Sequence, residues 1–168
     1  PRTEIQGFFK TAIVACTFSR DGYMIAAVGA DPDHSIALYK WQTGTLVASS
    51  RGSQEKIVCI KWSPFQDYIV TLGVKHCKFW SLEPFRSKRA EFTKGGRLQT
   101  MLCCCFPGPD NTVVGTQDGS LYLFKGFQLS LVIPEAHEVT QALSATRDVV
   151  VSAGKEGMIK FWAIDLSQ

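Results

Sequence analysis

The chain has 168 residues, of which 45% are hydrophobic and 20% charged, and its formal net charge at pH 7 is +3. This balance is typical of a globular domain and argues against a disordered chain. The longest apolar runs have the length of strands, far short of the roughly 20 residues that a membrane helix needs. We therefore expect a soluble protein. The chain begins with Pro1, and no signal segment follows it, which predicts a piece of a longer protein.

Six cysteines are present, and three of them, Cys103, Cys104 and Cys105, are consecutive. No C-x-x-C pair suggests a zinc site. We expect reduced thiols that pack as small hydrophobic side chains in the strands of an intracellular protein.

A pattern of similar units repeats along the chain. The predicted repeats are residues 13–50, 57–95, 101–135 and 139–168, and the last lacks its outer strand. Residues 1–12 are predicted to be a strand or linker from a preceding unit. Within them, EIQGFF (Glu4 to Phe9) is either an outer strand of that preceding unit or the missing strand of the fourth repeat.

Three landmarks keep step across the repeats. An aromatic residue ends the first strand at Phe18, Trp62 and Phe106. The second strand closes at Gly29, Gly73, Gly115 and Gly154, and the third strand ends on Tyr39, Trp80, Phe124 and Trp162. The tripeptide Lys-Phe-Trp occupies this last position twice, at 78–80 and 160–162.

Each repeat reads as four short strands separated by turns such as Arg20-Asp21-Gly22 and Gln117-Asp118-Gly119. No stretch shows sustained helical periodicity. Four antiparallel strands every 37 to 44 residues are typical of propeller blades. The sequence therefore predicts an all-β, WD-repeat β-propeller of about four four-stranded blades, and a fragment of a larger propeller.

The fourth repeat contains the residues of a hydrogen-bond relay: Trp162, Ser152, His137 and Glu156. The indole N–H donates to the serine, the serine to the imidazole and the imidazole to the carboxylate. We predict that this relay stabilises the blade. The alternative, a hydrolase triad of His137, Ser152 and Glu156, lacks a nucleophile-elbow motif.

The relay is predicted to decay in the other repeats. The second repeat keeps Thr71 and Trp80 but has no histidine before its first strand. The third keeps Thr116 and Asp118 but ends in Phe124, which has no N–H to donate.

Other candidate sites are weaker. His76 and Cys77 could suggest a metal or Cys/His site, but neighbours on a strand point to opposite faces. Asp31 and Asp33 resemble a calcium loop, although a polar turn is the favoured interpretation. No phosphate-binding or dinucleotide-binding glycine motif and no H-E-x-x-H motif occurs, so we expect no catalytic activity, cofactor or metal.

The charge is unevenly distributed. Residues 75–97 hold seven Lys or Arg against two Glu, a net +5, which leaves −2 for the rest. This stretch is either a solvated loop or a contact for an acidic partner, with Arg86, Lys88, Arg89, Lys94 and Arg97 as its candidate residues. Charge alone would also attract RNA or anionic lipid, but no nucleic-acid-binding motif accompanies it. We expect neither a nucleic-acid nor a membrane partner.

Several segments resemble the echinoderm microtubule-associated protein-like family of WD-repeat proteins. They are GVKHCKFW (Gly73 to Trp80), GRLQT (Gly96 to Thr100), FKG (Phe124 to Gly126), in which Phe replaces Trp, and AAVGAD (Ala26 to Asp31). The resemblance spans roughly Ile13 to Trp162. Lys75, His76, Lys78 and Trp80 match the family signature, and we expect structural roles for them, with the two lysines exposed.

The resemblance implies a cytoplasmic, cytoskeletal protein that binds tubulin or microtubules, or other proteins. The family's upstream hydrophobic tubulin-binding motif is missing from this sequence. A general protein-interaction scaffold without tubulin affinity is therefore the alternative, and an enzyme or ligand site in a central channel is a third. Uncovered blade faces also predict contact with the rest of the propeller or self-association.

Overall fold

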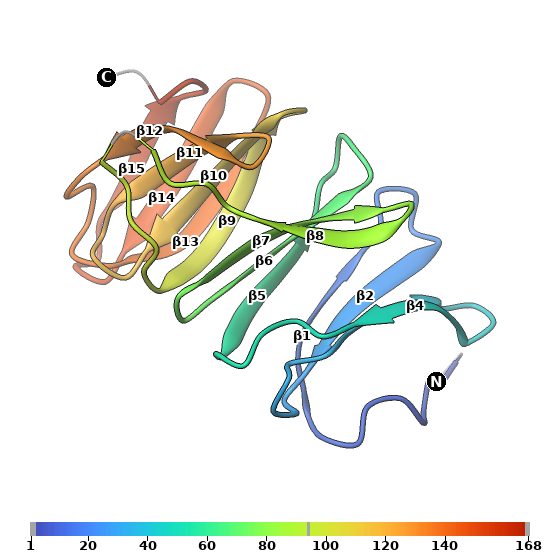
Figure 1. The fold of residues 1–168 in the computed structure, drawn as a ribbon. Helices are drawn as coiled ribbons and strands as arrows, with labels where there is room; N and C mark the ends of the chain where they lie inside the picture. Colours follow the sequence, from blue (N-terminus) through green and yellow to red (C-terminus); the bar gives the residue numbers. More distant parts are fainter. Residues whose placement is uncertain (1–2, 94, 167–168) are drawn as a thin grey trace. The chain divides into compact units, whose positions relative to one another are not determined.

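The computed structural model describes residues 3–93 and 95–166. Fifteen strands in these residues form four antiparallel sheets (Figure 1). None of the described residues belongs to a helix long and apolar enough to cross a membrane. The predicted all-β class is confirmed.

Contacts divide the chain into two compact units, Pro1–Ser87 and Lys88–Gln168, here the N-terminal and C-terminal units. The first sheet of the N-terminal unit has the order β1 (Ile13–Phe18), β2 (Met24–Gly29), β3 (Ile36–Lys40) and β4 (Thr45–Ser50). Residues 3–12, which precede it, form no strand.

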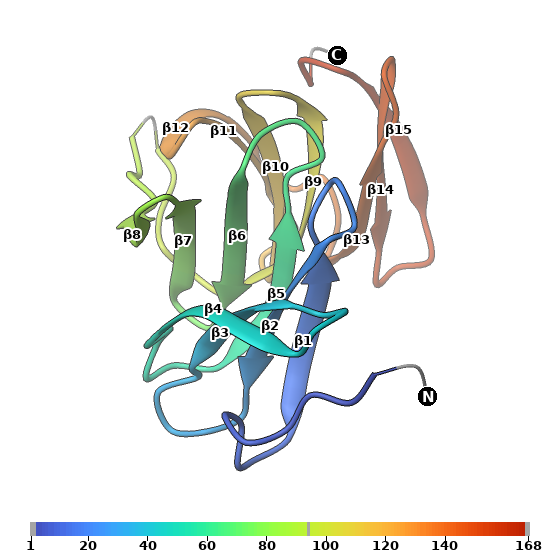
Figure 2. The same ribbon diagram turned by 90° about the vertical axis from the view of Figure 1, so that its right-hand side faces the viewer.

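The second sheet follows the same up-and-down order. It contains β5 (Ile57–Trp62), β6 (Tyr68–Gly73), β7 (His76–Leu82) and β8 (Phe85–Arg89). The last strand crosses the boundary between the two units in the chain. Figures 1 and 2 both show the β1–β2 and β5–β6 turns side by side at one end of the N-terminal unit.

The third sheet, in the C-terminal unit, contains β9 (Met101–Gly108), β10 (Asn111–Thr116), β11 (Leu121–Lys125) and β12 (Gln128–Ile133). The fourth contains three strands in the described residues, β13 (Thr140–Ala145), β14 (Val149–Gly154) and β15 (Ile159–Ala163).

Each unit has a hydrophobic core between its two sheets. In the N-terminal unit, β1 lies against β5, and the core includes Ile36, Ile57, Ile69 and Trp80, each at most 1% exposed. In the C-terminal unit, β9 lies against β13 around residues such as Val113. Burial of each large side chain contributes about 1.5–3 kcal/mol, so the packing of the two sheets against each other stabilises each unit.

The glycine landmark at the end of the second strand has a steric cause. A Cβ on Gly73 would lie 2.0 Å from the Lys56 carbonyl oxygen, and one on Gly115 would lie 2.5 Å from Thr140 Cγ2. Lys56 lies in the linker before the second sheet, and Thr140 begins the first strand of the fourth sheet. Each of these segments passes too close to the glycine for a side chain to fit. The repeated glycine therefore marks where a neighbouring segment crosses the strand end.

Gly119 in the β10–β11 turn combines two constraints. Its φ is +81°, and a Cβ there would lie 1.7 Å from the His137 carbonyl oxygen. Gly126 also has a positive φ, +58°, but nothing lies within 4 Å of its Cβ position. Comparison of Gly119 with Gly126 therefore distinguishes the effect of a positive φ from the effect of a close neighbouring segment.

We predict that Gly119→Ala lowers the free energy of unfolding by more than the roughly 1–2 kcal/mol expected for a strained φ alone. Gly126→Ala, the matched control, should lose only that amount. Urea unfolding of both variants measures the difference. Equal losses would show that the His137 linker moves aside without cost.

Candidate functional site

The four residues of the predicted relay lie together in the fourth sheet. Trp162 on β15 donates its indole N–H to Ser152 Oγ on β14 over 2.8 Å. Ser152 Oγ lies 2.7 Å from His137 Nε2, and His137 Nδ1 contacts Glu156 Oε1 in the following turn. Since the serine oxygen accepts from the indole, its own proton is donated to Nε2, and the proton on Nδ1 is donated to Glu156.

The relay is closed to solvent at its centre. Ser152 is 0% exposed and His137 is 6% exposed. The hydrogen bond from His137 lowers the pKa of Glu156 below its ordinary value, although burial opposes the shift. The Ser152 hydroxyl is buried and already accepts a hydrogen bond from the Trp162 indole, so it is not accessible to a substrate carbonyl. This argues against the hydrolase-triad alternative.

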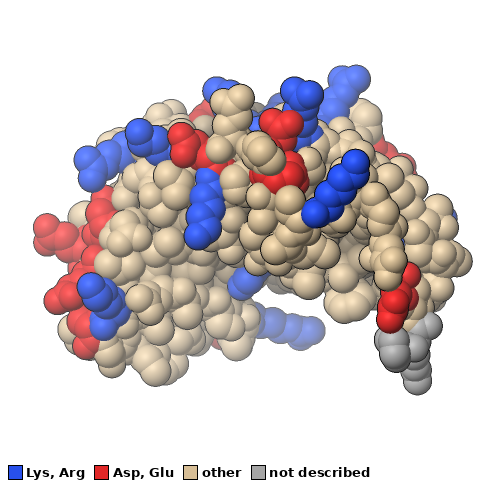
Figure 3. Space-filling view, turned by 90° about the horizontal axis from the view of Figure 1, so that it is seen from below, with Lys and Arg blue, Asp and Glu red and all other residues tan. Residues whose placement is uncertain are grey.

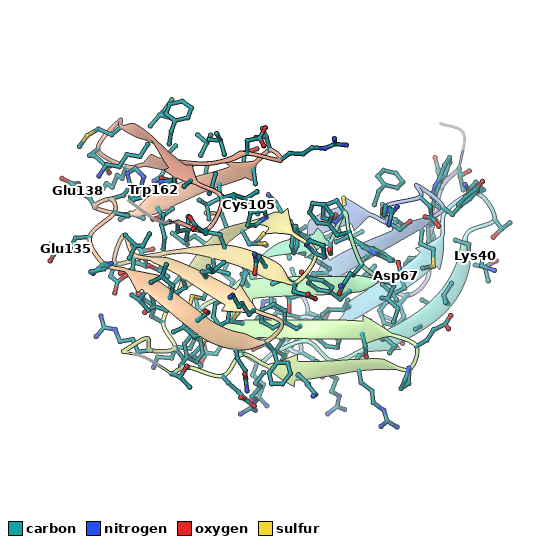
Figure 4. The ribbon with its side chains drawn as sticks, turned by 90° about the horizontal axis from the view of Figure 1, so that it is seen from above. Lys40, Asp67, Cys105, Glu135, Glu138 and Trp162 are labelled. Atoms are coloured by element: carbon teal, nitrogen blue, oxygen red, sulfur yellow. The ribbon has the colours of Figure 1, made fainter. Side chains whose placement is uncertain are left out.

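A shallow cavity of about 270 Å³ lies at this end of the fourth sheet. Its lining residues are Glu135, Ala136, His137, Glu138, Glu156, Met158 and Lys160. The Lys160 ammonium donates to the Ala136 carbonyl oxygen, so the lysine crosses the cavity wall instead of pointing into solvent. Figure 4 shows Glu135 and Glu138 pointing away from the ribbon at this edge, with Trp162 inside the sheet.

The second sheet contains a relay that the sequence did not predict. Trp80 Nε1 donates to Thr71 Oγ1 over 2.8 Å, and Thr71 Oγ1 lies 2.8 Å from His76 Nε2. The imidazole comes from the start of β7 instead of the linker before the sheet. The expectation that the relay decays in this repeat for want of a histidine was therefore wrong. The missed signal is the two-residue period, which places His76 and Trp80 on one face of the strand.

The lysine of each Lys-Phe-Trp tripeptide also has an internal partner. Lys78 Nζ donates to the Gly52 carbonyl oxygen over 2.6 Å, as Lys160 does to Ala136. Both carbonyls lie in the linker that precedes the sheet. The expectation of an exposed Lys78 was wrong, whereas Lys75 is exposed. The lysine of the tripeptide thus hydrogen-bonds to the linker before its sheet, and the tryptophan hydrogen-bonds to a hydroxyl on the second strand.

The third sheet satisfies its buried hydroxyl differently. Thr116 Oγ1 donates to Asp118 Oδ1 over 2.7 Å. Gln99 Nε2 donates to Asp118 Oδ2 over 2.7 Å and to the Tyr122 hydroxyl over 3.1 Å. Burial alone would raise the pKa of Asp118, but the hydrogen bonds from Thr116, Gln99 and Ser120 outweigh it and lower the pKa to about 2.

The first sheet carries a polar turn where a calcium loop was the alternative. Asp31 accepts hydrogen bonds from the backbone and hydroxyl of Ser35 and from the Asp33 amide. Asp33 pairs with Arg51 at 3.4 Å. These donors already occupy the Asp31 carboxylate, which favours the interpretation as a turn.

His76 and Cys77 do not form a shared site. His76 bonds to Thr71, and Cys77 is 4% exposed, with its thiol pKa raised by burial. Over residues 3–93 and 95–166, no group of three His, Cys, Asp or Glu side chains is placed to hold a metal ion.

Of the five residues predicted to contact an acidic partner, three lie on the exposed outer strand β8: Arg86, Lys88 and Arg89. Strand alternation places Arg86 and Lys88 on one face and Arg89 on the other. Lys88 Nζ lies 4.3 Å from the centre of the Phe127 ring. The remaining two differ: Arg97 pairs with Asp118 at 3.3 Å, and Lys94 lies outside the described residues.

The segment after β8 lies along the third sheet, and we call its described residues, 91–93 and 95–99, the strap. Glu91 forms a parallel bridge with Gln128 on β12, and the Phe92 ring packs edge-on against Phe124 at 5.8 Å. A Cβ on Gly96 would lie 2.0 Å from Leu129 Cδ2, so glycine permits the close approach. The strap part of the basic stretch thus contacts the third sheet, whereas Arg86, Lys88 and Arg89 on β8 are exposed, so the solvated surface and the contact for an acidic partner both stay predictions for β8.

Charge on the surface is mixed. Figure 3 shows Lys and Arg side chains dispersed among uncharged and acidic residues on the face that it presents, without merging into one basic surface. Arg86 and Arg89 have no acidic partner among the described residues. Of the residues predicted to contact an acidic partner, Arg86, Lys88 and Arg89 on β8 thus form the main local group of positive charges.

The sequence model of the family described as "Echinoderm microtubule-associated protein first beta-propeller" matches residues 3–168. The chain belongs to this family. The match covers all four sheets and the strap, so the resemblance seen in the short motifs is confirmed across the chain. The relay residues therefore lie within a propeller of this family.

Two curated relatives show the same affiliation. The 77 kDa echinoderm microtubule-associated protein of Lytechinus variegatus is 26% identical over 96% of this chain and 26% of its own length. Echinoderm microtubule-associated protein-like 1 of Homo sapiens is 29% identical over 94% of this chain and 20% of its own. The chain thus spans about a quarter or less of these family members.

A solved structure supports the propeller fold. The crystal structure of RRP9 WD40 repeats superimposes with a TM-score of 0.79 at 17% sequence identity, covering 98% of this chain and 52% of that one. The likeness shows the fold alone. Together with the family match, it confirms the predicted WD-repeat β-propeller class.

We predict that Trp80→Phe and Trp162→Phe each lower the free energy of unfolding by about 1–3 kcal/mol, because each leaves a buried hydroxyl without its indole donor. Trp62→Phe is the matched control. It removes the same atoms, but Trp62 Nε1 is buried with no hydrogen-bond partner among the described residues. Chemical denaturation measures all three. Equal losses would mean that ring volume, and not the relay, sets the cost.

A second prediction concerns pH. Because the pKa of Asp118 is lowered in the folded state, its stabilising effect is complete above the unfolded value near 3.8 and is lost as pH falls towards about 2. The difference in unfolding free energy between the parent and Asp118→Asn should therefore be constant above pH ~5 and shrink below pH ~4. Asp148→Asn, at an exposed carboxylate of the same unit, is the control for the loss of one negative charge. A difference that stays constant down to pH ~2 would contradict the Asp118 hydrogen bonds.

Proposed function

We propose that the chain is a noncatalytic WD-repeat segment of a microtubule-associated protein and that it contributes to tubulin or microtubule binding. The family match and the names of the relatives support the association with microtubules in general terms. The finer proposal, direct contact by this segment, depends on the basic outer strand β8.

Strand β8 carries three cations in five residues and no acidic residue. Arg86 and Arg89 are exposed, and their guanidinium groups have no acidic partner among the described residues. Microtubules present strongly acidic surfaces, which attract such a cluster at low salt and attract it less as screening rises. Electrostatic attraction therefore supports a direct contact.

A second candidate function is a protein-interaction scaffold without tubulin affinity. One observation favours it: Lys88 and Arg97 already have internal partners, a Phe127 ring and the Asp118 carboxylate. The charge available to an acidic partner is correspondingly smaller than the net +5 of residues 75–97 suggests.

The rest of the proposal follows from the family and the sheets. We infer a cytoplasmic, cytoskeletal location, no cofactor, and blades that correspond to residues 13–50, 57–95, 101–135 and 139–168. The relay of His137, Ser152, Glu156 and Trp162 then serves to hold its blade together. Full burial of Ser152 supports a structural role over a catalytic one.

Cosedimentation with polymerised tubulin across a salt series tests the proposal. Arg86→Glu/Arg89→Glu should weaken binding at low salt by about tenfold or more. The variant's unfolding free energy should stay within about 0.5 kcal/mol of the parent, since both side chains are exposed.

The matched control is Arg147→Glu/Lys155→Glu, which makes the same change in net charge at two exposed residues in turns of the fourth sheet. It should bind nearly as well as the parent. Equal weakening in both double variants would show that net charge, and not the position of the arginines, sets the binding. If the folded parent does not pellet with microtubules at any salt concentration, the scaffold without tubulin affinity is favoured.

A further inference from the structure

Strand β4 is the outer strand of the first sheet, and no segment of the described residues pairs with its outer edge. Figure 2 shows β4 in the foreground of the N-terminal unit. Its six residues, Thr45–Ser50, include no charged residue and no proline, and Leu46 and Val47 are 43% and 47% exposed. An apolar edge without such protection is a template for pairing with another extended chain.

The backbone of Leu46 faces away from the sheet. The Gly29 amide donates to the Ser35 carbonyl oxygen, so the backbone groups of Ser35 point towards β2. Because these groups alternate in direction along a strand, those of Lys40 point towards β4, where Thr45 is the partner of Lys40 in the register. The amide and carbonyl of Leu46 therefore point outwards, and neither has a hydrogen-bond partner among the described residues.

The equivalent edge of the third sheet is covered. Leu129 has the same place on β12 that Leu46 has on β4, because each leucine pairs with the aromatic residue that ends the third strand of its sheet. The Leu129 amide donates to the Glu91 carbonyl oxygen over 2.9 Å, and the Glu91 amide donates to the Phe127 carbonyl oxygen over 2.9 Å. Leu129 is only 2% exposed. The strap thus binds the outward-facing amide on β12 that is free on β4.

The outer strand of the second sheet is protected in another way. Strand β8 carries Arg86, Lys88 and Arg89, and charged side chains on an edge strand oppose pairing with another chain. Of the outer strands β4, β8 and β12, only β4 has neither charged side chains nor a covering segment within residues 3–93 and 95–166.

The N-terminal residues of the chain do not occupy this edge. Thr3 and Ile5 precede β1 by the same distances along the sequence as Glu91 and Thr93 precede β9. The Thr93 hydroxyl donates to the Leu129 carbonyl oxygen over 2.8 Å. No hydrogen bond joins the described Thr3 or Ile5 to β4. The edge of β4 is therefore open to a segment from another molecule.

The structure favours a partner protein over a second copy of this chain. The strap runs parallel to β12 where it bridges that strand, whereas β4 strands of two copies related by a twofold axis would pair antiparallel. A contact between two strands of six residues is also well below the roughly 1,200 Å² that a stable interface buries.

We propose that the outer edge of β4 binds an uncharged, extended segment of a partner protein by strand addition. The backbone of that segment pairs with the outward-facing groups of Leu46, which supplies affinity. Aliphatic or β-branched side chains of the segment pack on Leu46 and Val47, which supplies selectivity. Because β4 carries no charge, binding should depend little on salt, in contrast to the proposed acidic partner of β8.

The test is a titration of the isotope-labelled 168-residue chain with a peptide of about eight alternating Val and Thr residues, the length of a strand, with one lysine at each end for solubility. Saturable NMR shifts are expected at the amides of residues 44–49. Hydrogen exchange at the Leu46 amide should slow by about tenfold or more, because this amide gains an acceptor. The same peptide with N-methylated central residues is the control ligand. It keeps the side chains but cannot donate hydrogen bonds, so it should not bind.

Leu46→Lys should weaken peptide binding by about fivefold or more, because it removes an apolar contact and places a charge on the edge. Leu131→Lys is the matched control, since Leu131 is 36% exposed on β12, where the strap covers the edge. It should leave the affinity unchanged. Both exposed substitutions should keep the unfolding midpoint of the parent.

Absence of saturable shifts, equal affinity for the N-methylated peptide, or equal affinity in Leu46→Lys and the parent would each overturn the proposal. Dimerisation without peptide that protects the Leu46 amide would overturn it in favour of a second copy. Slow exchange of this amide in the free monomer would overturn it by showing that the chain already covers its own edge.

This proposal does not depend on contact with microtubules. Arg86→Glu/Arg89→Glu should leave binding of the peptide unchanged, and a parent chain that fails to pellet with microtubules should still bind the peptide. Loss of peptide binding in the arginine variant would contradict β4 as the binding site.

Discussion

A hydrogen bond from a buried indole N–H to a hydroxyl on the neighbouring strand is the constraint on which much of this structure depends. Trp80 donates to Thr71, and Trp162 donates to Ser152. Each hydroxyl is 0% exposed, so its own proton also needs an acceptor, and a histidine supplies one in both sheets. In the fourth sheet the second ring nitrogen then needs a partner, which brings in Glu156 from the turn. Burial of one polar group thus requires a connected set of side chains.

The sheets satisfy this demand with different residues. In the fourth sheet the histidine comes from the preceding linker, whereas in the second it comes from the head of the third strand itself. The third sheet has Phe124 where the second and fourth sheets have Trp, and Thr116 donates directly to Asp118. Gln99 on the strap completes that arrangement, so the same contacts that satisfy Asp118 also hold the basic stretch against the sheet. A structural solution inside the third sheet therefore limits which cations are available to a partner.

The surface proposed for binding an acidic partner depends on solution conditions. The outer strand β8 offers charge on an extended backbone, and its attraction for an acidic surface is long-ranged and screened by salt.

The sequence by itself determined the repeats, the all-β class, the family and the relay of the fourth sheet. Those features depend on local spacing: the two-residue period of strands, glycine-bearing turns, and four polar residues at the right points of one repeat. Only the tertiary structure decided that His76 replaces a missing linker histidine, that Lys78 bonds to Gly52, and that the strap lies along β12. It also decided that Phe18, Trp41 and Phe65 share one end of a unit. Sequence spacing reports which face of its own strand a residue occupies, but the partner that a buried donor or an exposed ring meets depends on which distant segment packs there.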